Sequence, residues 1–283
     1  MLAIDRTVTG IKPTLNDHDV LEFCKNGFLI LKGVIPKATN EWVFEQLDRD
    51  DGHETELADS ERFVNEVFLN PALTGVLRSL LGDNFLIPEQ VHNHRLEGRK
   101  KPLPWHIDAG ARFDRSLDLV YAFYVPQANT NAGGTTYLLP GSHLVPITRE
   151  ELQHFGHLAG QVQTIAPAGS VFIVHSSIWH RQGNKTDLGT RNLVRWSYWR
   201  SQPPRRDWIV DPDFDIGRVD FAIESDYFTS ATRRWQSVPR IAEMFMWMCG
   251  KSEDFRWLGG NGWPYNHSPS SLLDKQGWIS DRA

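Results

Sequence analysis

Cysteine is scarce in this chain. Its 283 residues include two cysteines, Cys24 and Cys249, which lie far apart in the sequence. Two distant cysteines do not make a disulfide framework, so we expect reduced thiols in a cytoplasmic protein. The first ten residues, MLAIDRTVTG, contain no apolar run after a basic start, and we therefore expect no secretory signal peptide.

Long apolar runs and an excess of basic charge are missing as well. No stretch reaches the roughly 18 consecutive apolar residues that a membrane span needs, so no membrane partner is expected. The formal net charge of −5 gives no reason to expect nucleic acid as a partner. Two short basic runs, EGRKK (97–101) and PPRR (203–206), are typical of solvated surface.

Hydrophobic residues are plentiful enough for one sizeable core, at 40% of the sequence. No repeat, low-complexity tract or linker divides the chain, so we expect a single domain over residues 1–283. Its pattern predicts a mainly helical part over about 1–83, a strand-rich core over about 84–200 and a C-terminal extension over about 201–283.

Three helices are expected in the first part. The first has Thr14 as its N-cap and ends at Gly27, and the second is capped by Asn40. The third begins at Pro71 and ends at Gly82, with leucines spaced so that they share one face. Near the end of the chain, a further helix is expected to be interrupted at a proline, Pro239.

From about residue 85 the apolar pattern alternates with a period of two. Turns rich in glycine, proline and asparagine separate the alternating segments, which favours an antiparallel barrel or a double-sheet jelly roll. Because helices come first and strands follow, the predicted class is α+β. The expected strands cover 28–35, 85–98, 117–126, 135–140, 162–167, 170–176 and 191–200.

His106 and Asp108, in the stretch PWHIDAG (104–110), are candidate metal ligands. Residues i and i+2 of a strand project to the same side, so an imidazole and a carboxylate so placed can bind one divalent metal. The pair alone is weak, since roughly one His-x-Asp is expected by chance in a chain of this size. The third candidate is His180, which lies in a much later segment, VHSSIWHRQGN.

Two histidines and one carboxylate on one face of a metal leave its other positions open, as non-haem Fe(II) oxygenases require. A zinc hydrolase can use the same three ligands, so the ligand set does not choose between them. Arg191, which follows His180 after a turn, favours the oxygenase, because a buried guanidinium beside a metal calls for an anion such as a chelating dicarboxylate. The alternative is that Arg191 pairs with one of the chain's own acids.

Several motifs together resemble one known family. The segments WHID, AGGTTYLLPGSHL and WHRQGNKTDLGTR, in this order and spacing, resemble the phytanoyl-CoA dioxygenase family of Fe(II)- and 2-oxoglutarate-dependent oxygenases. CKNGFLILKGVIP is similar to that family's N-terminal helix and strand, and the resemblance covers residues 15 to 200. It implies a double-stranded β-helix core, a cupin-like variant of the jelly roll, with flanking N-terminal helices.

The resemblance also implies a site. His106, Asp108 and His180 correspond to the iron ligands, and Arg191 corresponds to the arginine that holds the distal carboxylate of 2-oxoglutarate. Thr136 matches a position where a hydroxyl often contacts this cosubstrate. The implied cofactor and cosubstrates are Fe(II), 2-oxoglutarate and O₂.

Two further positions carry over from the family. Gln182 falls where a small polar residue often assists, although it is larger than the serine expected there. Asn93, on the strand expected before His106, resembles a polar position near the metal.

The substrate pocket is expected on the strand that follows Arg191. Alternation places Arg195 and Trp199 on the same face as Arg191, so both are expected to line the pocket. Arg195, together with Arg112 in the loop after Asp108, is expected to meet an anionic or polar group of the substrate. The alternative for Arg195 is an ion pair with a buried acid.

The resemblance implies an oxidoreductase that hydroxylates a C–H bond of a small molecule and releases succinate and CO₂. The family hydroxylates many small molecules, so its name does not identify the substrate. Two alternatives stay open: a non-catalytic metal-binding relative of this fold, and a metal-dependent hydrolase with the same triad. The apolar run IAEMFMWMC (241–249) covers the barrel, forms a lid or makes a homodimer contact, and the sequence does not rank these three.

Overall fold

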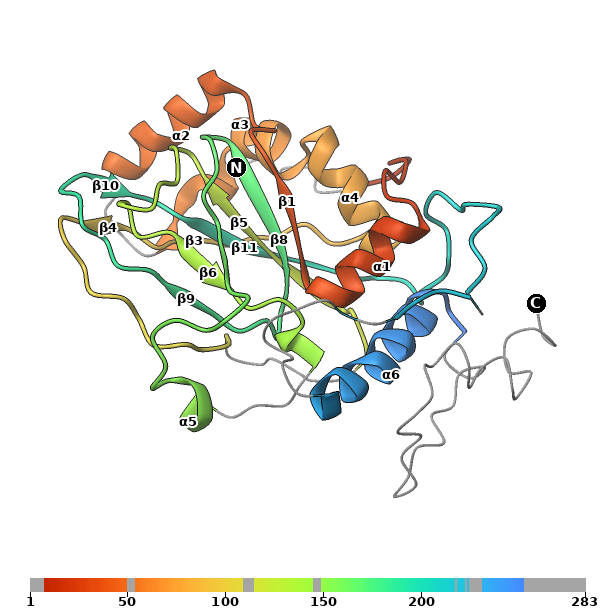
Figure 1. Cartoon of the computed structure of the whole chain (residues 1–283). Coiled ribbons are helices and arrows are strands. Elements are labelled where there is room, and N and C mark those ends of the chain that lie inside the picture. Colours follow the sequence, from red (N-terminus) through yellow and green to blue (C-terminus); the bar gives the residue numbers. More distant parts are fainter. Residues whose placement is uncertain are drawn as a thin grey trace.

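The computed structural model describes residues 8–49, 54–108, 115–144, 149–216, 218–221, 223 and 231–251. Within these ranges, helices cover one face of a large antiparallel sheet, and smaller sheets lie against its other face (Figure 1). This is the predicted combination of N-terminal helices and a jelly-roll core. No described helix has the length and apolar character of a membrane span.

Helix α1 (Asp17–Asn26) begins two residues later than predicted. Its N-cap is Asn16 and not Thr14, because Asn16 forms a reciprocal capping box with Asp19, with both N–O distances at 3.0 Å. The helix ends at Gly27, as predicted, in the left-handed conformation (φ 78°). A Cβ atom at this position would lie 2.4 Å from Nδ1 of His143, so only glycine fits.

Helix α2 (Lys37–Arg49) starts before Asn40, so the prediction that Asn40 caps it is wrong. The Asn40 side chain instead donates a hydrogen bond to the Ile35 carbonyl and accepts one from the Tyr124 hydroxyl, which joins the helix to the sheet. Helix α4 (Pro71–Leu81) matches the prediction and is capped by Asn70. Short helical turns connect α2 to α4: η1 (Glu56–Asp59), α3 (Glu61–Phe63) and η2 (Val64–Phe68).

The large sheet has six strands in the order β1-β8-β5-β11-β3-β2. Every neighbouring pair is antiparallel, and the two edge strands, β1 and β2, both come from the N-terminal part of the chain. The bounds are β1 (Phe28–Leu31), β2 (Glu54–Thr55), β3 (Val91–Asn93), β5 (Leu119–Val125), β8 (Ser170–His175) and β11 (Val194–Trp199).

The two faces of this sheet bury different clusters. On β5, Ala122 and Tyr124 belong to the core shared with the helices. Phe123 and Val125 point to the other side and pack with Leu138 of a smaller sheet. This alternation defines an inner face of the large sheet, which looks into the jelly roll, and a helix-covered face.

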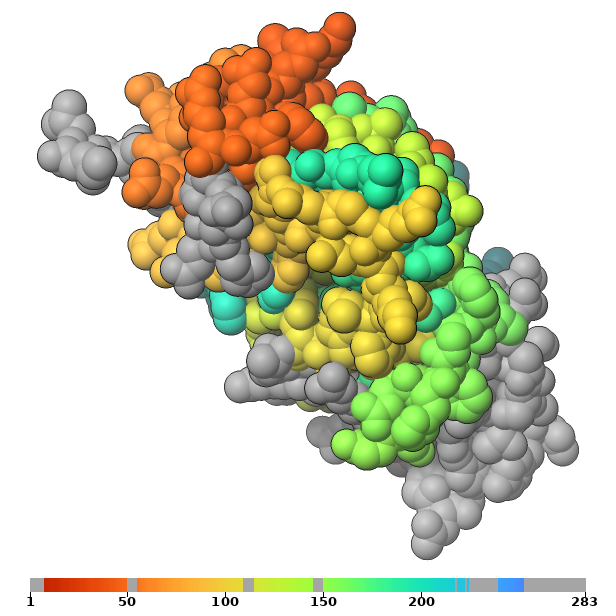
Figure 2. Space-filling view, turned by 90° about the vertical axis from the view of Figure 1, so that its left-hand side faces the viewer, coloured from red at the N-terminus to blue at the C-terminus, as the bar shows by residue number. Residues whose placement is uncertain are grey.

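Two smaller sheets close the inner face. One has the order β7-β6-β9 and the other pairs β10 with β4. Their bounds are β4 (Leu96–Glu97), β6 (Thr136–Leu138), β7 (Val162–Gln163), β9 (His180–Gln182) and β10 (Thr190–Arg191). The strand expected over 85–98 is therefore split between β3 and β4, and β9 was not predicted. In the space-filling view, the yellow segment with β3 and β4 lies between the orange helices and the green segment with α5 (Arg149–Leu152) (Figure 2).

Helix α6 (Ala231–Met248) runs through Pro239 without the predicted interruption. Its apolar run from Ile241 to Cys249 contributes buried side chains to the core that the N-terminal helices share with the large sheet. It lies beside α1, where the Cys24 and Met248 sulfur atoms are 3.6 Å apart (Figure 1). This apolar run thus covers the helical layer.

The segment before α6 is anchored on Asp17, whose carboxylate is fully buried in the first turn of α1. Both oxygens of Asp17 accept hydrogen bonds of 2.7 Å from Arg206. The indole of Trp208 and the backbone N–H of Asp211 each donate one more, also at 2.7 Å. Asp17 therefore fastens residues 206–211 to α1.

Candidate metal centre

His106 and His180 are held together by their backbones. The N–H of each residue donates to the carbonyl of the other, with N–O distances of 3.0 and 2.9 Å. Their ring centroids lie 4.5 Å apart, and Asp108 follows two residues after His106. The candidate ligand atoms of the three residues all lie within 4.8 Å of one another, so the structure brings the predicted triad together.

Both imidazoles present the same nitrogen to the cluster. Nδ1 of His106 lies 2.9 Å from the Pro104 carbonyl, and Nδ1 of His180 lies 3.1 Å from the Ile178 carbonyl. A carbonyl oxygen can only accept, so Nδ1 carries the hydrogen in each ring and Nε2 keeps its lone pair. Metal-binding histidines are oriented by this kind of hydrogen bond.

The charge state of the triad also suits a cation. Burial lowers the pKa of His180 and outweighs the opposing attraction of Asp108, so the ring is neutral at pH 7. Oδ2 of Asp108 is buried and accepts no hydrogen bond from the described residues. It lies 3.9 Å from Nε2 of His180, too far for a hydrogen bond. Two imidazole lone pairs and a buried carboxylate oxygen fit a divalent metal such as Fe(II) or Zn(II).

Arg191, in β10, carries a buried charge. Its side chain is 4% exposed, and its guanidinium donates one hydrogen bond of 3.0 Å to the Thr136 hydroxyl. Nε is buried without a hydrogen bond, and no described carboxylate lies within 4.0 Å of the guanidinium. Burial lowers the pKa of Arg191 to about 10, so the side chain stays charged at neutral pH. Such a group calls for an anion from outside the described chain.

Thr136 and Gln182 lie across from each other on β6 and β9. Two residues further along the same strand pair, Leu138 faces His180, so alternation puts all four side chains on the inner face. Gln182 donates a hydrogen bond of 3.2 Å to the Lys101 carbonyl. Thr136 therefore joins Arg191 directly, whereas Gln182 fastens the segment that leads to His106.

Asn93 does not face the cluster. It pairs with Val194, whose side chain lies in the helix-covered core, and its amide donates to Asn192 at 3.0 Å. The expectation that Asn93 lies near the metal is therefore corrected. The neighbouring residue, His92, pairs with Arg195 and shares the inner face with it.

Arg195 contacts a triad member. One guanidinium nitrogen lies 3.3 Å from Oδ2 of Asp108, and the guanidinium carbon lies 4.3 Å from the centre of the Tyr121 ring. The acid considered as an alternative partner is thus Asp108 itself. Trp199 lies at the far end of β11, opposite Leu119, and is 47% exposed, so the structure does not bring it to the triad. Arg112 lies outside the described residues.

The outer side of the centre holds a feature that the sequence reasoning missed. The guanidinium of Arg181 lies between two rings, 5.3 Å from Trp105 and 5.1 Å from Tyr137. Arg181 is 5% exposed and follows His180, while Trp105 precedes His106. The sequence does contain one indication of this contact. Arg181 and Trp105 are each adjacent in sequence to a candidate ligand, so their side chains project to the opposite face of the strand. This Arg181 stack lies behind both histidines, on the face of the strands that points away from the triad.

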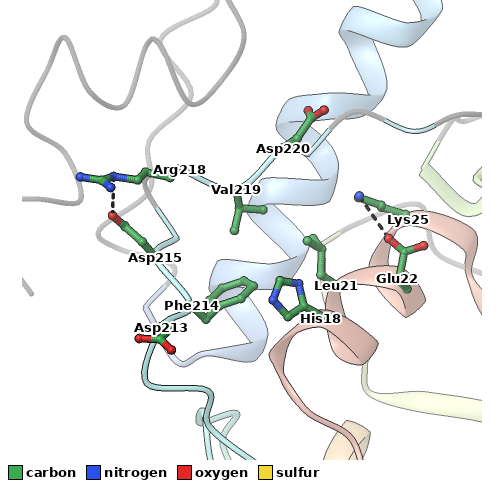
Figure 3. A pocket seen from close by; sticks show the side chains of 10 residues that line it. All are labelled: His18, Leu21, Glu22, Lys25, Asp213, Phe214, Asp215, Arg218, Val219 and Asp220. Carbon is green, nitrogen blue, oxygen red and sulfur yellow. Dashed lines mark hydrogen bonds and ion pairs between the residues drawn. The ribbon is translucent and has the colours of Figure 1, made fainter.

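A separate surface pocket of about 400 Å³ lies between α1 and residues 213–215 and 218–220 (Figure 3). It shares no residue with the triad. Its rim mixes acidic and basic side chains, including the ion pairs Lys25–Glu22 and Arg218–Asp215. His18, which is exposed, packs edge-on against Phe214, with the ring centroids 5.0 Å apart.

The chain matches no protein-family model and no curated protein, but its fold is similar to that of solved structures. HygX from Streptomyces hygroscopicus, solved with nickel and 2-oxoglutarate bound, matches with a TM-score of 0.55 and 19% identity, over 69% of this chain and 90% of its own. EctD from S. alaskensis, solved with 2-oxoglutarate and 5-hydroxyectoine, matches with 0.53 and 17%, over 70% and 80%. The apo non-heme monooxygenase ThoJ matches with 0.53 and 16%, over 80% and 99%. These likenesses establish the jelly-roll fold.

Proposed function

We propose that this chain is an Fe(II)- and 2-oxoglutarate-dependent dioxygenase, of the phytanoyl-CoA dioxygenase type, that hydroxylates a C–H bond of a small molecule. The reaction consumes O₂ and 2-oxoglutarate and releases succinate and CO₂. Residues 1–283 are proposed to form one such domain. The fold is shared with HygX and EctD, whose structures contain 2-oxoglutarate, and the triad has the ligand types that Fe(II) takes in this class.

Arg191 is the observation that carries the proposal. A buried guanidinium with one hydroxyl partner and no described carboxylate is costly unless an anion neutralises it. A diacid that binds the metal through one end and Arg191 through the other meets both requirements. Thr136 fixes the direction of the guanidinium, so the two residues form one receptor for the distal carboxylate.

The remaining roles follow from the contacts. Nε2 of His106, Nε2 of His180 and a carboxylate oxygen of Asp108 would hold the metal, while the Pro104 and Ile178 carbonyls orient the two rings. Ferrous iron bound there supplies the activation of O₂, the chemistry that no protein side chain can perform. The inner face holds apolar side chains such as Phe123 and Leu138, which exclude water from the reacting atoms.

The alternative functions have no use for Arg191. A metal-dependent hydrolase needs the triad and a bound water, and a metal-binding relative without activity needs the triad alone. Neither accounts for the buried guanidinium of Arg191, which has no carboxylate within 4.0 Å among the described residues.

Succinate formation is the deciding measurement. The purified chain is incubated with Fe(II), ascorbate, O₂ and 2-oxoglutarate, and succinate is quantified with and without a chelator. We expect succinate that depends on Fe(II), because these enzymes turn over slowly without their main substrate. A chain that binds the metal but neither binds 2-oxoglutarate nor forms succinate would not be an oxygenase of this kind. An H180A variant controls for contaminating activity.

A further inference from the structure

The inner face next to the triad carries a second arginine, Arg195, whose position differs from that of Arg191. Arg195 lies on β11 between Phe123 of β5 and His92 of β3, and its side chain is 22% exposed. Arg191 is nearly sealed, at 4% exposure. A molecule that enters from solvent can therefore reach Arg195 while Arg191 is occupied.

The contacts of Arg195 hold it in place but leave part of its hydrogen-bonding capacity unused. Its guanidinium lies against the Tyr121 ring at 4.3 Å, which fixes the plane of the group. Within the described part of the chain, Asp108 is the one carboxylate within 4.0 Å of it, and Nε is buried without a hydrogen bond. Among the described residues, the counter-ion of Arg195 is thus Asp108, the same carboxylate that would hold the metal.

Counted over the described residues, the charges of the loaded centre do not balance. A divalent metal contributes two positive charges, Arg191 and Arg195 contribute one each, and Asp108 contributes one negative charge. The bound 2-oxoglutarate contributes two negative charges. One positive charge remains, and it belongs to Arg195, because metal binding claims the Asp108 carboxylate.

We propose that Arg195 binds a carboxylate of the substrate, so that this enzyme acts on small monoanionic acids held beside the metal. The inference rests on the function proposed above. A carboxylate matches the single surplus charge, whereas a phosphate carries about 1.5 to 2 negative charges at pH 7 and exceeds it. Arg195 also sets the position of the substrate, because its contact with Asp108 places the bound carboxylate next to the metal.

Acetate and acetamide test this inference, because they have the same shape and differ in charge. The full chain is loaded with Ni(II), which does not start the oxidation, and with saturating 2-oxoglutarate, which occupies Arg191. Binding of each probe is then measured by calorimetry. We expect acetate to bind about tenfold more tightly than acetamide, the preference that one charge-assisted hydrogen bond gives.

Variants then assign the preference to a residue. The preference for acetate should disappear in R195Q and persist in R195K, which keeps the charge. R62Q is the control, because it removes a positive charge from α3, away from the site. The preference for acetate should persist in this variant. Equal binding of the two probes, absence of acetate binding to the wild-type chain, or a preference that survives in R195Q would overturn the proposal.

The same experiment separates this inference from the proposed function. If the nickel-loaded wild-type chain does not bind 2-oxoglutarate, the proposed function fails and the acetate step is not reached. If 2-oxoglutarate binds and acetate is not preferred, the dioxygenase proposal stands and the assignment of a carboxylate substrate is wrong. The comparison of acetate with acetamide uses the wild-type chain, so it does not depend on whether R195Q folds.

Discussion

His106 and His180 exchange both of their backbone hydrogen bonds, and their rings lie 4.5 Å apart. Two candidate ligands from segments far apart in the sequence are thus fixed by main-chain atoms rather than by side-chain contacts alone. The two histidines of the candidate metal site are therefore positioned by the strand pairing itself.

Replacing His180 by alanine should abolish tight metal binding without unfolding the chain. The loss of one of three ligands should weaken Ni(II) or Fe(II) binding by at least about 100-fold, since even the partners of ligands contribute 10- to 100-fold. The backbone pairing with His106 remains, so far-ultraviolet circular dichroism should be unchanged. Metal titration by calorimetry measures the effect, with His154→Ala, at an exposed histidine, as the matched control.

Replacing Arg191 by methionine should stabilise the metal-free protein. The substitution keeps most of the volume and removes a buried charge that has no described counter-ion. A gain of about 1 kcal/mol corresponds to a rise of about 2–4 °C in the thermal midpoint of a domain of this size.

The same variant should lose its response to the cosubstrate. 2-Oxoglutarate should raise the midpoint of the metal-loaded wild type and leave that of R191M unchanged. R205M, at an exposed arginine, is the control for a change of surface charge. A lower midpoint in metal-free R191M would mean that a partner outside the described residues neutralises Arg191.

Replacing Arg181 should weaken metal binding, although the Arg181 side chain lies on the face of the strand opposite to that of His180. Its stack with Trp105 and Tyr137 ties the neighbours of both histidines together. Arg181→Met should lower the free energy of unfolding by about 2 kcal/mol, the value of a desolvated cation–π contact. It should also weaken Ni(II) binding by roughly tenfold. Unchanged metal affinity in a destabilised variant would limit the stack to a structural role.

Ionisation of Asp17 should make the stability of the folded chain depend on pH. Burial alone would raise the pKa of its carboxyl, but the hydrogen bonds from Arg206, Asp211 and Trp208 outweigh it and lower the pKa. A lowered pKa in the folded state contributes stability above the unfolded value of about 3.9. This contribution is lost as the pH falls from there through the folded value.

Asp17→Asn should therefore cost about 1.5–3 kcal/mol of unfolding free energy at pH 7, the range for hydrogen bonds to charged groups, because it removes the charge that Arg206 binds. The difference from wild type should shrink when urea titrations are repeated at pH values below 4. Asp213→Asn, at an exposed carboxylate, should show neither effect. A difference that stays constant down to pH 2 would mean that packing, and not ionisation, accounts for the loss.

Local rules predicted the parts of the site that depend on spacing along one strand. His106 and Asp108 share a side because they are two residues apart, and Gly27 ends α1 because the chain must turn through a left-handed residue there. The strand-rich core and its alternation could be recognised for the same reason. These features need no knowledge of which strand lies next to which.

Features that depend on pairing between distant segments could not be predicted. His92 and Asn93 are adjacent in the sequence, and the register of β3 against β11 alone decides which of the two side chains faces inward. The contact between Arg195 and Asp108 likewise requires the fold. Pro239 interrupts no helix here, since the packing of Ile241 and its neighbours in the core outweighs the local cost.

The edges of the large sheet have a consequence for how the protein is made. Strand β1 leaves the ribosome early, whereas its partner β8 begins at Ser170, in the second half of the sequence. Because synthesis adds about 5–20 residues per second, β1 waits on the order of ten seconds for that partner. During synthesis the apolar strand β1 exists long before β8, so the nascent chain exposes this unpaired strand until Ser170–His175 have been made, and we expect chaperones to bind it then.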